Sequence, residues 1–324
     1  MSTMSAVATP GKRPCVALLS SVLDMSYLAP AFRETMPDVD LRLGADLGGL
    51  DDVDAAVCWY PPPSVLASMS RLRLVQSLGA GIDHFHTDPH LPQGPVLCRI
   101  VDADMAGTMT AYVTWAVIHQ QRSMGKYLAS AAASLWQEQP IVPPGRHCVG
   151  IAGLGTLGVA CAQALRSIGY RVRGWSRSAK TGLPEGIESF HGPDELDAFL
   201  GGCDTLVCLL PLTPQTQGFL NGALFRRLPK GAHLINVGRG SHLVEADLLR
   251  ALDDGTLGAA TIDAFAQEPL PPDHPFWRHP RIVVTPHIAA RTEAIAIARQ
   301  TRDNLAALVR GERPDAAVDP QLGY

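Results

Sequence analysis

Residues 149–158, VGIAGLGTLG, decide the fold of this 324-residue chain. They place glycines in the pattern Gly-x-Gly-x-x-Gly directly after a short apolar strand and at the start of an expected helix. In that context Gly153 permits a tight turn, Gly155 lets the backbone approach a pyrophosphate, and Gly158 lets the helix pack closely on the strand. The free N–H groups of the helix N-terminus then face the anion. The stretch therefore predicts a dinucleotide-binding site.

Apolar strands alternate with polar connectors or helical segments on both sides of this stretch, in two groups. The strands expected in the first group are Cys15–Leu19, Ala55–Trp59, Leu74–Leu78 and Val96–Ile100. Those expected in the second group are Cys148–Ala152, Tyr170–Trp175, Thr205–Leu209, His233–Val237, Ala259–Asp263 and Ile282–Thr285. Long helices are expected over Asp102–Arg122 and Thr292–Arg310. Apolar strands with helical crossovers are typical of parallel sheets covered on both faces, so the chain is predicted to be an α/β protein.

The composition excludes several classes of protein. The length corresponds to about two domains, and 46% hydrophobic residues exclude wholesale disorder. Because 27 basic residues stand against 31 acidic ones, giving a net charge of −4, no nucleic-acid partner is expected. The uncharged run 148–165 is interrupted by the glycines of the turn. It therefore predicts a strand, a turn and a helix rather than a membrane span.

The cysteines and histidines indicate a reduced, metal-free protein. Seven cysteines include no Cys-x-x-Cys pair, and most of them lie in apolar runs. Buried thiols in a reducing cytoplasm are the expected state, so we expect a cytoplasmic location. The eleven histidines show no spacing typical of a metal site, so no metal ligand is predicted.

The segment after the second strand of the glycine-loop unit predicts which dinucleotide binds. An NAD site usually carries Asp or Glu about 20 residues after the glycines, bonded to the ribose 2′-hydroxyl. Here Ser176, Arg177, Ser178 and Lys180 occupy that place, and the next acidic residue is Glu185. Basic and hydroxyl groups bind a 2′-phosphate through charge-assisted hydrogen bonds. We therefore expect NADP(H) to be preferred, with NAD(H) possible.

Three further motifs follow strand ends of the same expected sheet. Arg239 lies between two glycines, Glu268 stands directly before a proline, and His287 lies between the last strand and the closing helix. Reduction of a 2-keto acid needs a proton for the carbonyl oxygen, and a histidine can donate it near neutral pH. Glu268 would orient the imidazole, and Arg239 would pair with the substrate carboxylate. The three residues are our predicted catalytic group.

A second glycine-rich turn lies in the first half of the chain, at residues 77–84, SLGAGIDH. It follows an expected strand, and such a turn can present backbone N–H groups to a carboxylate. A bare turn without a ligand is an equally good interpretation of this motif alone.

Taken together, these motifs resemble those of the D-isomer-specific 2-hydroxyacid dehydrogenases, in the same order along the chain. The matching stretches are the glycine loop 153–158, the run 236–240, the run 263–270 and Thr285-Pro286-His287. Within the family the chain is similar to the members that reduce glyoxylate and hydroxypyruvate with NADPH. The residues that carry this likeness are Trp59, 175–178, 210–213, 274–277 and the ending 318–324.

The resemblance implies two Rossmann-like or flavodoxin-like domains with parallel sheets, the cofactor domain being inserted into the substrate domain. Residues 1–101 and 288–324 would form the substrate domain, and residues 102–287 the NADP-binding Rossmann domain. It also implies a homodimer, formed partly through the segment Tyr127–Gln139.

The expected contacts follow from the motifs and the resemblance together. The expected cofactor-binding residues are Gly153, Gly155, Thr156, Leu157, Gly158, Ser176, Arg177, Ser178, Lys180, Pro211, Val237, Gly238 and Asp263. The expected substrate-binding residues are Trp59, Gly79, Ala80, Gly81, Arg239 and His287, with the backbone amides of the glycine turn on the carboxylate and Trp59 as a wall.

The sequence leaves alternatives to NADPH-dependent reduction of a short 2-keto acid. A related dehydrogenase could act on another D-2-hydroxy acid, bulkier or phosphorylated as in phosphoglycerate. A protein on this fold could also bind a dinucleotide as a sensor without catalysis. Turnover of NADPH with a 2-keto acid separates the enzymes from the sensor.

Overall fold

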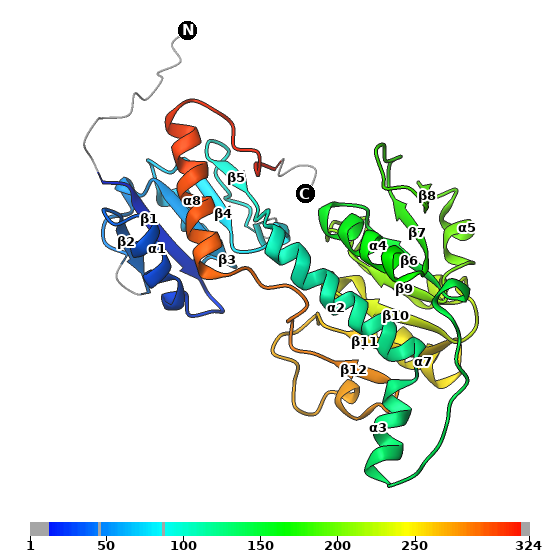
Figure 1. The fold of residues 1–324 in the computed structure, drawn as a ribbon. Coiled ribbons are helices and arrows are strands. Elements are labelled where there is room, and N and C mark those ends of the chain that lie inside the picture. The colour runs from blue at the N-terminus through cyan, green and yellow to red at the C-terminus, as the bar shows by residue number, and fades with distance from the viewer. Residues whose placement is uncertain (1–12, 45–46, 86–87, 319–324) are drawn as a thin grey trace. The chain divides into compact units, whose positions relative to one another are not determined.

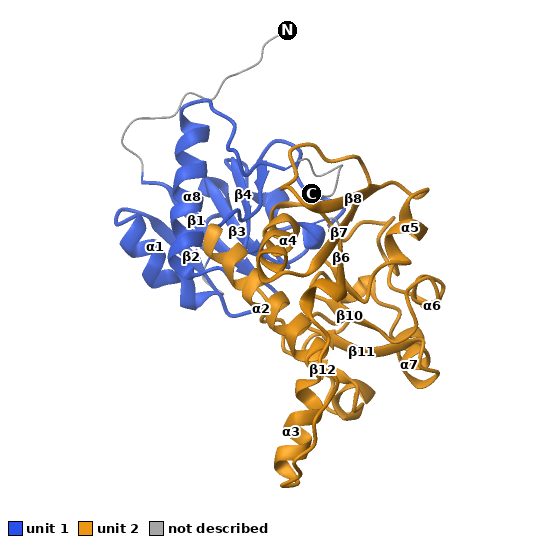
Figure 2. Ribbon diagram, turned by 45° about the vertical axis from the view of Figure 1, so that its right-hand side comes forward, with its two compact units in different colours: residues 1–102, 292–324 blue, residues 103–291 orange. Residues whose placement is uncertain are grey.

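The computed structural model describes residues 13–44, 47–85 and 88–318, so the similarity at residues 319–324 lies outside the described residues. The chain divides into two compact units, residues 1–102 with 292–324 and residues 103–291 (Figure 2). The sequence predicts these divisions after residues 101 and 287, whereas the units divide after residues 102 and 291. Segment 288–291 belongs to the second unit, where the side chain of Asp263 accepts hydrogen bonds from the backbone of Ile288 and Ala289.

Unit 1 contains a five-stranded parallel sheet in the order β2-β1-β3-β4-β5 (Figure 1). This is the strand order of flavodoxin-like folds. Its strands are β1 (Cys15–Ser20), β2 (Asp40–Leu43), β3 (Ala55–Trp59), β4 (Leu74–Ser77) and β5 (Val96–Cys98). Its α-helices are α1 (Ala29–Thr35) and α8 (Ala294–Val309), and α8 packs against α1.

Unit 2 contains a seven-stranded parallel sheet in the order β12-β11-β10-β9-β6-β7-β8 (Figure 1). The strands are β6 (Cys148–Ala152), β7 (Arg171–Ser176), β8 (Ile187–His191), β9 (Thr205–Cys208), β10 (Ala232–Asn236), β11 (Leu257–Ile262) and β12 (Ile282–Val284). The helices are α2 (Ala103–Gln121), α3 (Met124–Ala132), α4 (Thr156–Ile168), α5 (Leu196–Leu200), α6 (Gly222–Phe225) and α7 (Glu245–Asp253). The two parallel sheets confirm the predicted α/β class.

The core explains why the strands of unit 2 are apolar throughout. Along β9, Leu206 and Cys208 pack with residues of α5, α6 and α7, whereas Val207 between them packs with α2 and α4. Along β10, Leu234 belongs to the first of these clusters and Ile235 to the second. Because successive side chains point to opposite faces, a sheet covered on both sides needs apolar residues at every position.

Strands β2 and β8 were not expected from the sequence. Both are edge strands, and most of their side chains are exposed or only partly buried. An edge strand with polar residues lacks the continuous apolar run on which the other strands were recognised. The helix expected over Asp102–Arg122 ends at Gln121, and Ser123 in a left-handed conformation (φ 55°) separates it from α3.

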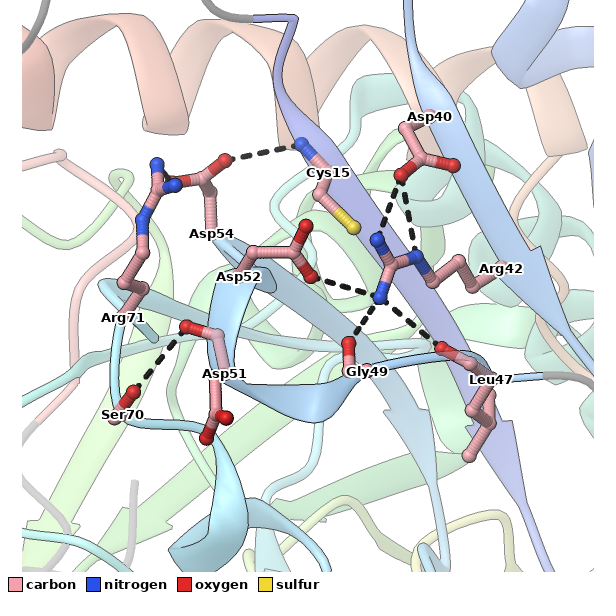
Figure 3. A network of polar contacts seen from close by, with 10 residues as sticks. All are labelled: Cys15, Asp40, Arg42, Leu47, Gly49, Asp51, Asp52, Asp54, Ser70 and Arg71. Carbon is pink, nitrogen blue, oxygen red and sulfur yellow. Dashed lines mark hydrogen bonds and ion pairs between the residues drawn. The ribbon is translucent and has the colours of Figure 1, made fainter.

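A charged network closes the amino end of the unit 1 sheet, where β1 and β2 begin (Figure 3). The guanidinium of Arg42 pairs with Asp40 and Asp52, each 2.8 Å away. The backbone N–H of Cys15 donates to Asp54 (3.0 Å). Burial raises the pKa of the Cys15 thiol to about 12, so it stays protonated at neutral pH. Through Arg42, the network ties the edge strand β2 to the residues that precede β3.

Candidate active site

The carboxyl ends of the unit 2 strands share one edge, because every pairing in this sheet is parallel. From β6 the chain first adds β7 and β8 on one side and then β9 to β12 on the other side, so the strand order reverses between β6 and β9. Ligands of open α/β sheets bind outside the carboxyl ends of the strands at such a point. The glycine loop follows β6, and the three predicted catalytic residues follow β10, β11 and β12. The fold therefore gathers them at the edge where the ligand is expected.

The glycine loop has the shape that a bound phosphate group requires. Gly153 has φ +111°, and a Cβ atom there would lie 2.5 Å from the carbonyl oxygen of Leu209. A Cβ at Gly158 would lie 1.8 Å from the carbonyl oxygen of Gly153, so α4 can approach β6 only without a side chain. At Gly155 a Cβ would meet nothing within 4 Å, and Gly155 and Thr156 are exposed. The N-terminus of α4 is thus open to an anion, which fits a dinucleotide pyrophosphate.

The end of β7 presents a basic, hydroxyl-rich segment. Ser176 is buried and its hydroxyl donates to the carbonyl oxygen of Ser178 (2.9 Å), which folds the segment back on itself. Arg177, Ser178 and Lys180 are exposed. A cluster of this kind fits a phosphate group better than a ribose hydroxyl, since it offers donors and positive charge.

The loop after β10 is packed tightly against the loop after β11. A Cβ at Gly240 would lie 1.8 Å from the carbonyl carbon of Phe265, so only glycine fits between them. The backbone N–H of Arg239 donates to His242 Nδ1 (3.0 Å), and the guanidinium Nη1 donates to the carbonyl oxygen of Gly238 (3.1 Å). Val237 and Gly238 are buried at this edge, and Pro211 after β9 is partly buried there.

The side chains of Glu268 and His287 lie within hydrogen-bonding distance of each other. His287 Nδ1 lies 2.9 Å from Glu268 Oε2 and 3.1 Å from Oε1. Burial alone would raise the pKa of Glu268, but hydrogen bonds from His287 and from the Phe265 N–H, with the nearby charges of His287 and Arg239, hold it below its usual value. The carboxylate is therefore ionised at neutral pH, directly beside the ring of His287.

Asp263 is buried at 1% exposure, and both of its oxygens face the loop that carries His287. They accept hydrogen bonds from the N–H groups of Ile288 and Ala289 and from the hydroxyl of Thr285. Thr285 in turn contacts the hydroxyl of Tyr112 on α2. Sequence reasoning missed Tyr112 and Thr285 as site residues, because a tyrosine on an apolar helix stripe is indistinguishable from a core residue.

The expected substrate residues of unit 1 lie at the carboxyl ends of β3 and β4. Ser77 closes the glycine turn, since its hydroxyl accepts from Gly79 N–H (3.2 Å) and donates to the carbonyl oxygen of Gly81 (2.8 Å). Trp59 is half-buried beside this turn, and a Cβ at Gly79 would lie 3.6 Å from its ring. His84 contacts Trp59 with a ring-centroid distance of 4.8 Å and was not singled out from the sequence.

Within residues 13–44, 47–85 and 88–318, no group of three or more His, Cys, Asp or Glu side chains is placed to hold a metal ion. No helix in those same ranges has the length and apolar character needed to cross a membrane.

Comparison with known proteins assigns the chain to a family. The model of the D-isomer-specific 2-hydroxyacid dehydrogenase NAD-binding domain matches residues 114–289. A glyoxylate/hydroxypyruvate reductase A from Serratia proteamaculans is 44% identical over 276 residues, which cover 84% of this chain and 88% of the relative. Another protein of that name, from Yersinia enterocolitica, is 41% identical over 282 residues, 86% of this chain and 90% of the relative.

Solved structures agree with this result. A NADPH-dependent glyoxylate/hydroxypyruvate reductase from Sinorhizobium meliloti, in complex with NADP and sulfate, has a TM-score of 0.90 at 36% identity, covering 97% of this chain and 100% of that one. A D-isomer-specific 2-hydroxyacid dehydrogenase from Xanthobacter autotrophicus, in complex with NADPH and MES, has a TM-score of 0.90 at 34% identity, with the same coverage. Because the family model spans more than half of the chain and the relatives cover most of it, the chain belongs to the family of D-isomer-specific 2-hydroxyacid dehydrogenases.

Proposed function

We propose that this enzyme reduces a short 2-keto acid, glyoxylate or hydroxypyruvate, to the 2-hydroxy acid with NADPH. The observation that carries the proposal is the pair of His287 and Glu268, joined at 2.9 Å, with the charge of Arg239 acting on it at the carboxyl edge of the sheet. The names of the relatives from Serratia, Yersinia and Sinorhizobium support the choice of substrate and cofactor.

His287 acts as the proton donor in this proposal. Its Nδ1 is engaged by Glu268, which fixes the ring orientation and leaves Nε2 to donate to the carbonyl oxygen of the substrate. The carboxylate of Glu268 stabilises the imidazolium before the transfer. Arg239 binds the substrate carboxylate and polarises the carbonyl group through charge-assisted hydrogen bonds. When bound, NADPH supplies the hydride.

The cofactor is held by the glycine loop and by the segment after β7. Gly153, Gly155 and Gly158 with the N-terminus of α4 bind the pyrophosphate, and Arg177 with Lys180 binds the 2′-phosphate. The exposure of these two basic side chains supports NADPH over NADH, and the next acidic residue along the chain is Glu185. The remaining proposed cofactor contacts are Thr156, Leu157, Ser176, Ser178, Pro211, Val237, Gly238 and Asp263.

Unit 1 is the substrate domain in this proposal, and unit 2 is the NADP-binding domain. The backbone amides of Ala80 and Gly81 bind the substrate carboxylate, and Trp59 limits the size of the substrate. The closed hydrogen bonding of the turn around Ser77 supports this assignment, because it holds the backbone in one conformation.

The arm formed by α3 and the residues after it is the proposed homodimer contact. Leu128, Leu135 and Trp136 are 63%, 61% and 95% exposed there, far more than large apolar residues of a monomer surface usually show in one place. We also propose a cytoplasmic location, which the seven free, buried cysteines support.

The test is a panel of keto acids with each cofactor, followed as NADPH or NADH oxidation. We expect turnover of glyoxylate and hydroxypyruvate, with kcat/KM for NADPH at least tenfold above that for NADH. Replacing Arg177 with Ser should raise the KM for NADPH and leave that for NADH unchanged. The matched control is Arg171→Ser, which removes an exposed arginine from the opposite end of β7. No turnover of any 2-keto acid would favour a dinucleotide sensor, and a preference for bulky keto acids would favour a different dehydrogenase.

A further inference from the structure

The backbone of His287 is in an unusual conformation. Its φ of 52° lies in the left-handed region, which residues with a side chain seldom adopt. Such a conformation is strained for a residue with a Cβ atom, and it persists only where the surroundings impose it. The surroundings of His287 therefore contain groups that hold the loop, and these groups set where the imidazole lies.

Asp263 accepts the hydrogen bonds that fix this loop. Its backbone carbonyl accepts from His287 N–H (2.9 Å), and its side-chain oxygens accept from the N–H groups of Ile288 and Ala289 (2.9 Å each). Thr285, two residues before His287, donates its hydroxyl to Asp263 Oδ1 (2.6 Å). One aspartate thus fixes the chain on both sides of the histidine.

Tyr112 extends this hold to helix α2. Its hydroxyl bonds to Thr285 Oγ1. Since the single hydroxyl proton of Thr285 goes to Asp263, Tyr112 must donate and Thr285 must accept. Burial raises the pKa of Tyr112, so the phenol keeps its proton throughout the working pH range. Helix α2 packs against α4 and β10, so the chain of hydrogen bonds ends on a rigid element.

We propose that Tyr112 and Thr285 are positioning residues, which act through Asp263 to hold the loop that aims His287 at the substrate. In this role Asp263 acts through the loop that carries His287. The inference rests on the proposed function of His287 as proton donor. A buried carboxylate whose two oxygens are occupied by its own chain is suited to fixing geometry, and a small misplacement of a catalytic group lowers the rate steeply.

The test removes one hydroxyl at a time. We expect Tyr112→Phe and Thr285→Val to lower kcat about tenfold, while the Kd of NADPH, measured by fluorescence without substrate, stays within twofold. Thr285→Ser keeps the hydroxyl and should restore kcat. The matched control is Tyr170→Phe, which removes another buried phenol of unit 2, one that donates to Gln121 at the far end of α2. This control should leave kcat unchanged.

A second readout does not depend on activity. Amide hydrogen exchange of residues 287–289 should accelerate in Tyr112→Phe and not in Tyr170→Phe. Should Thr285→Val fail to fold, Tyr112→Phe decides the matter, because it removes a single oxygen atom. Unchanged kcat and unchanged exchange in Tyr112→Phe overturn the inference, as does a weaker Kd for NADPH with unchanged kcat. A wild-type enzyme without keto-acid turnover, or a fully active His287→Asn variant, overturns the proposed function instead.

Discussion

Two histidines of unit 2, His287 and His233, differ in their position on the sheet, their exposure and their hydrogen-bond partners. His287 follows β12 at the carboxyl edge of the sheet, its side chain is 31% exposed, and a carboxylate lies 2.9 Å from its ring. His233 lies in β10 near the amino edge and is only 3% exposed. Its Nε2 bonds to the hydroxyl of Thr261 (3.0 Å), and its Nδ1 has no hydrogen-bond partner in the part of the chain that the structure describes.

The difference decides which histidine can handle a proton. Burial lowers the pKa of His233 to about 3, and the neighbouring His147 and His119 add to the effect. His233 is therefore neutral at any pH at which the enzyme works. His287 has both solvent access and an anionic partner, which is what the proposed proton donor requires. Whether a histidine is suited to proton transfer therefore depends on its exposure and on a neighbouring carboxylate.

The largest expected difference between the two histidines is in kcat when each imidazole is removed in turn. We expect His287→Asn to lower kcat about 10³-fold, because proton donation to the carbonyl oxygen is lost. His233→Gln is the control from the same sheet, and it should change kcat less than threefold. Steady-state kinetics at saturating NADPH and glyoxylate measure both. A His287→Asn enzyme with near-normal kcat would falsify the assignment of the proton donor.

The next largest effect concerns the carboxylate partner. Glu268 has a lowered pKa and is ionised at neutral pH, so Glu268→Gln removes a negative charge beside His287. The imidazolium then loses its stabilisation, and we expect kcat at pH 7 to fall about tenfold. The alkaline limb of the pH–rate profile should also move to lower pH, because a neutral amide does not favour the charged ring.

The matched control is Glu195→Gln in the same unit. It removes the carboxylate charge beside His191, the other member of a second His–Glu pair. Its pH–rate profile should coincide with that of the wild type. A Glu268→Gln profile that runs parallel to the wild type, lower at every pH by the same factor, would assign Glu268 to geometry alone.

The sequence was sufficient to predict which residues lie together where this depends on the order of the strands. Parallel strands bring their carboxyl ends to one edge, so Arg239, Glu268 and His287 meet there even though they lie far apart in the sequence. The glycine loop was predictable for a similar reason, since Gly153 and Gly158 are required by backbone contacts that any side chain would block. In both cases a local pattern and the topology together determine the geometry.

Other features depend on packing that no local pattern encodes. Tyr112 lies on the apolar stripe of α2, and only the tertiary fold brings its hydroxyl to Thr285. Strands β2 and β8 take their places at sheet edges, where polar side chains are tolerated. The burial that separates His233 from His287, and the carboxylate that lies beside only the latter, likewise come from the tertiary fold.

The smallest expected effect is on the pH dependence of stability, to which the buried His233 contributes. Its folded-state pKa of about 3 lies below the value of 6.5 that a histidine has in an unfolded chain. Between these two values the unfolded state binds a proton that the folded state excludes, so stability is lost as pH falls from about 6.5.

In His233→Gln this contribution to stability is absent. We expect the slope of unfolding free energy against pH, from urea titrations between pH 6 and 4.5, to become shallower by up to about 1.4 kcal/mol per pH unit. From pH 7.5 to 8.5 the imidazole is neutral in both states, so the slopes of variant and wild type should coincide there. Equal slopes in the acid range would mean that His233 is protonated in the folded protein, and the contrast between the two histidines would be lost.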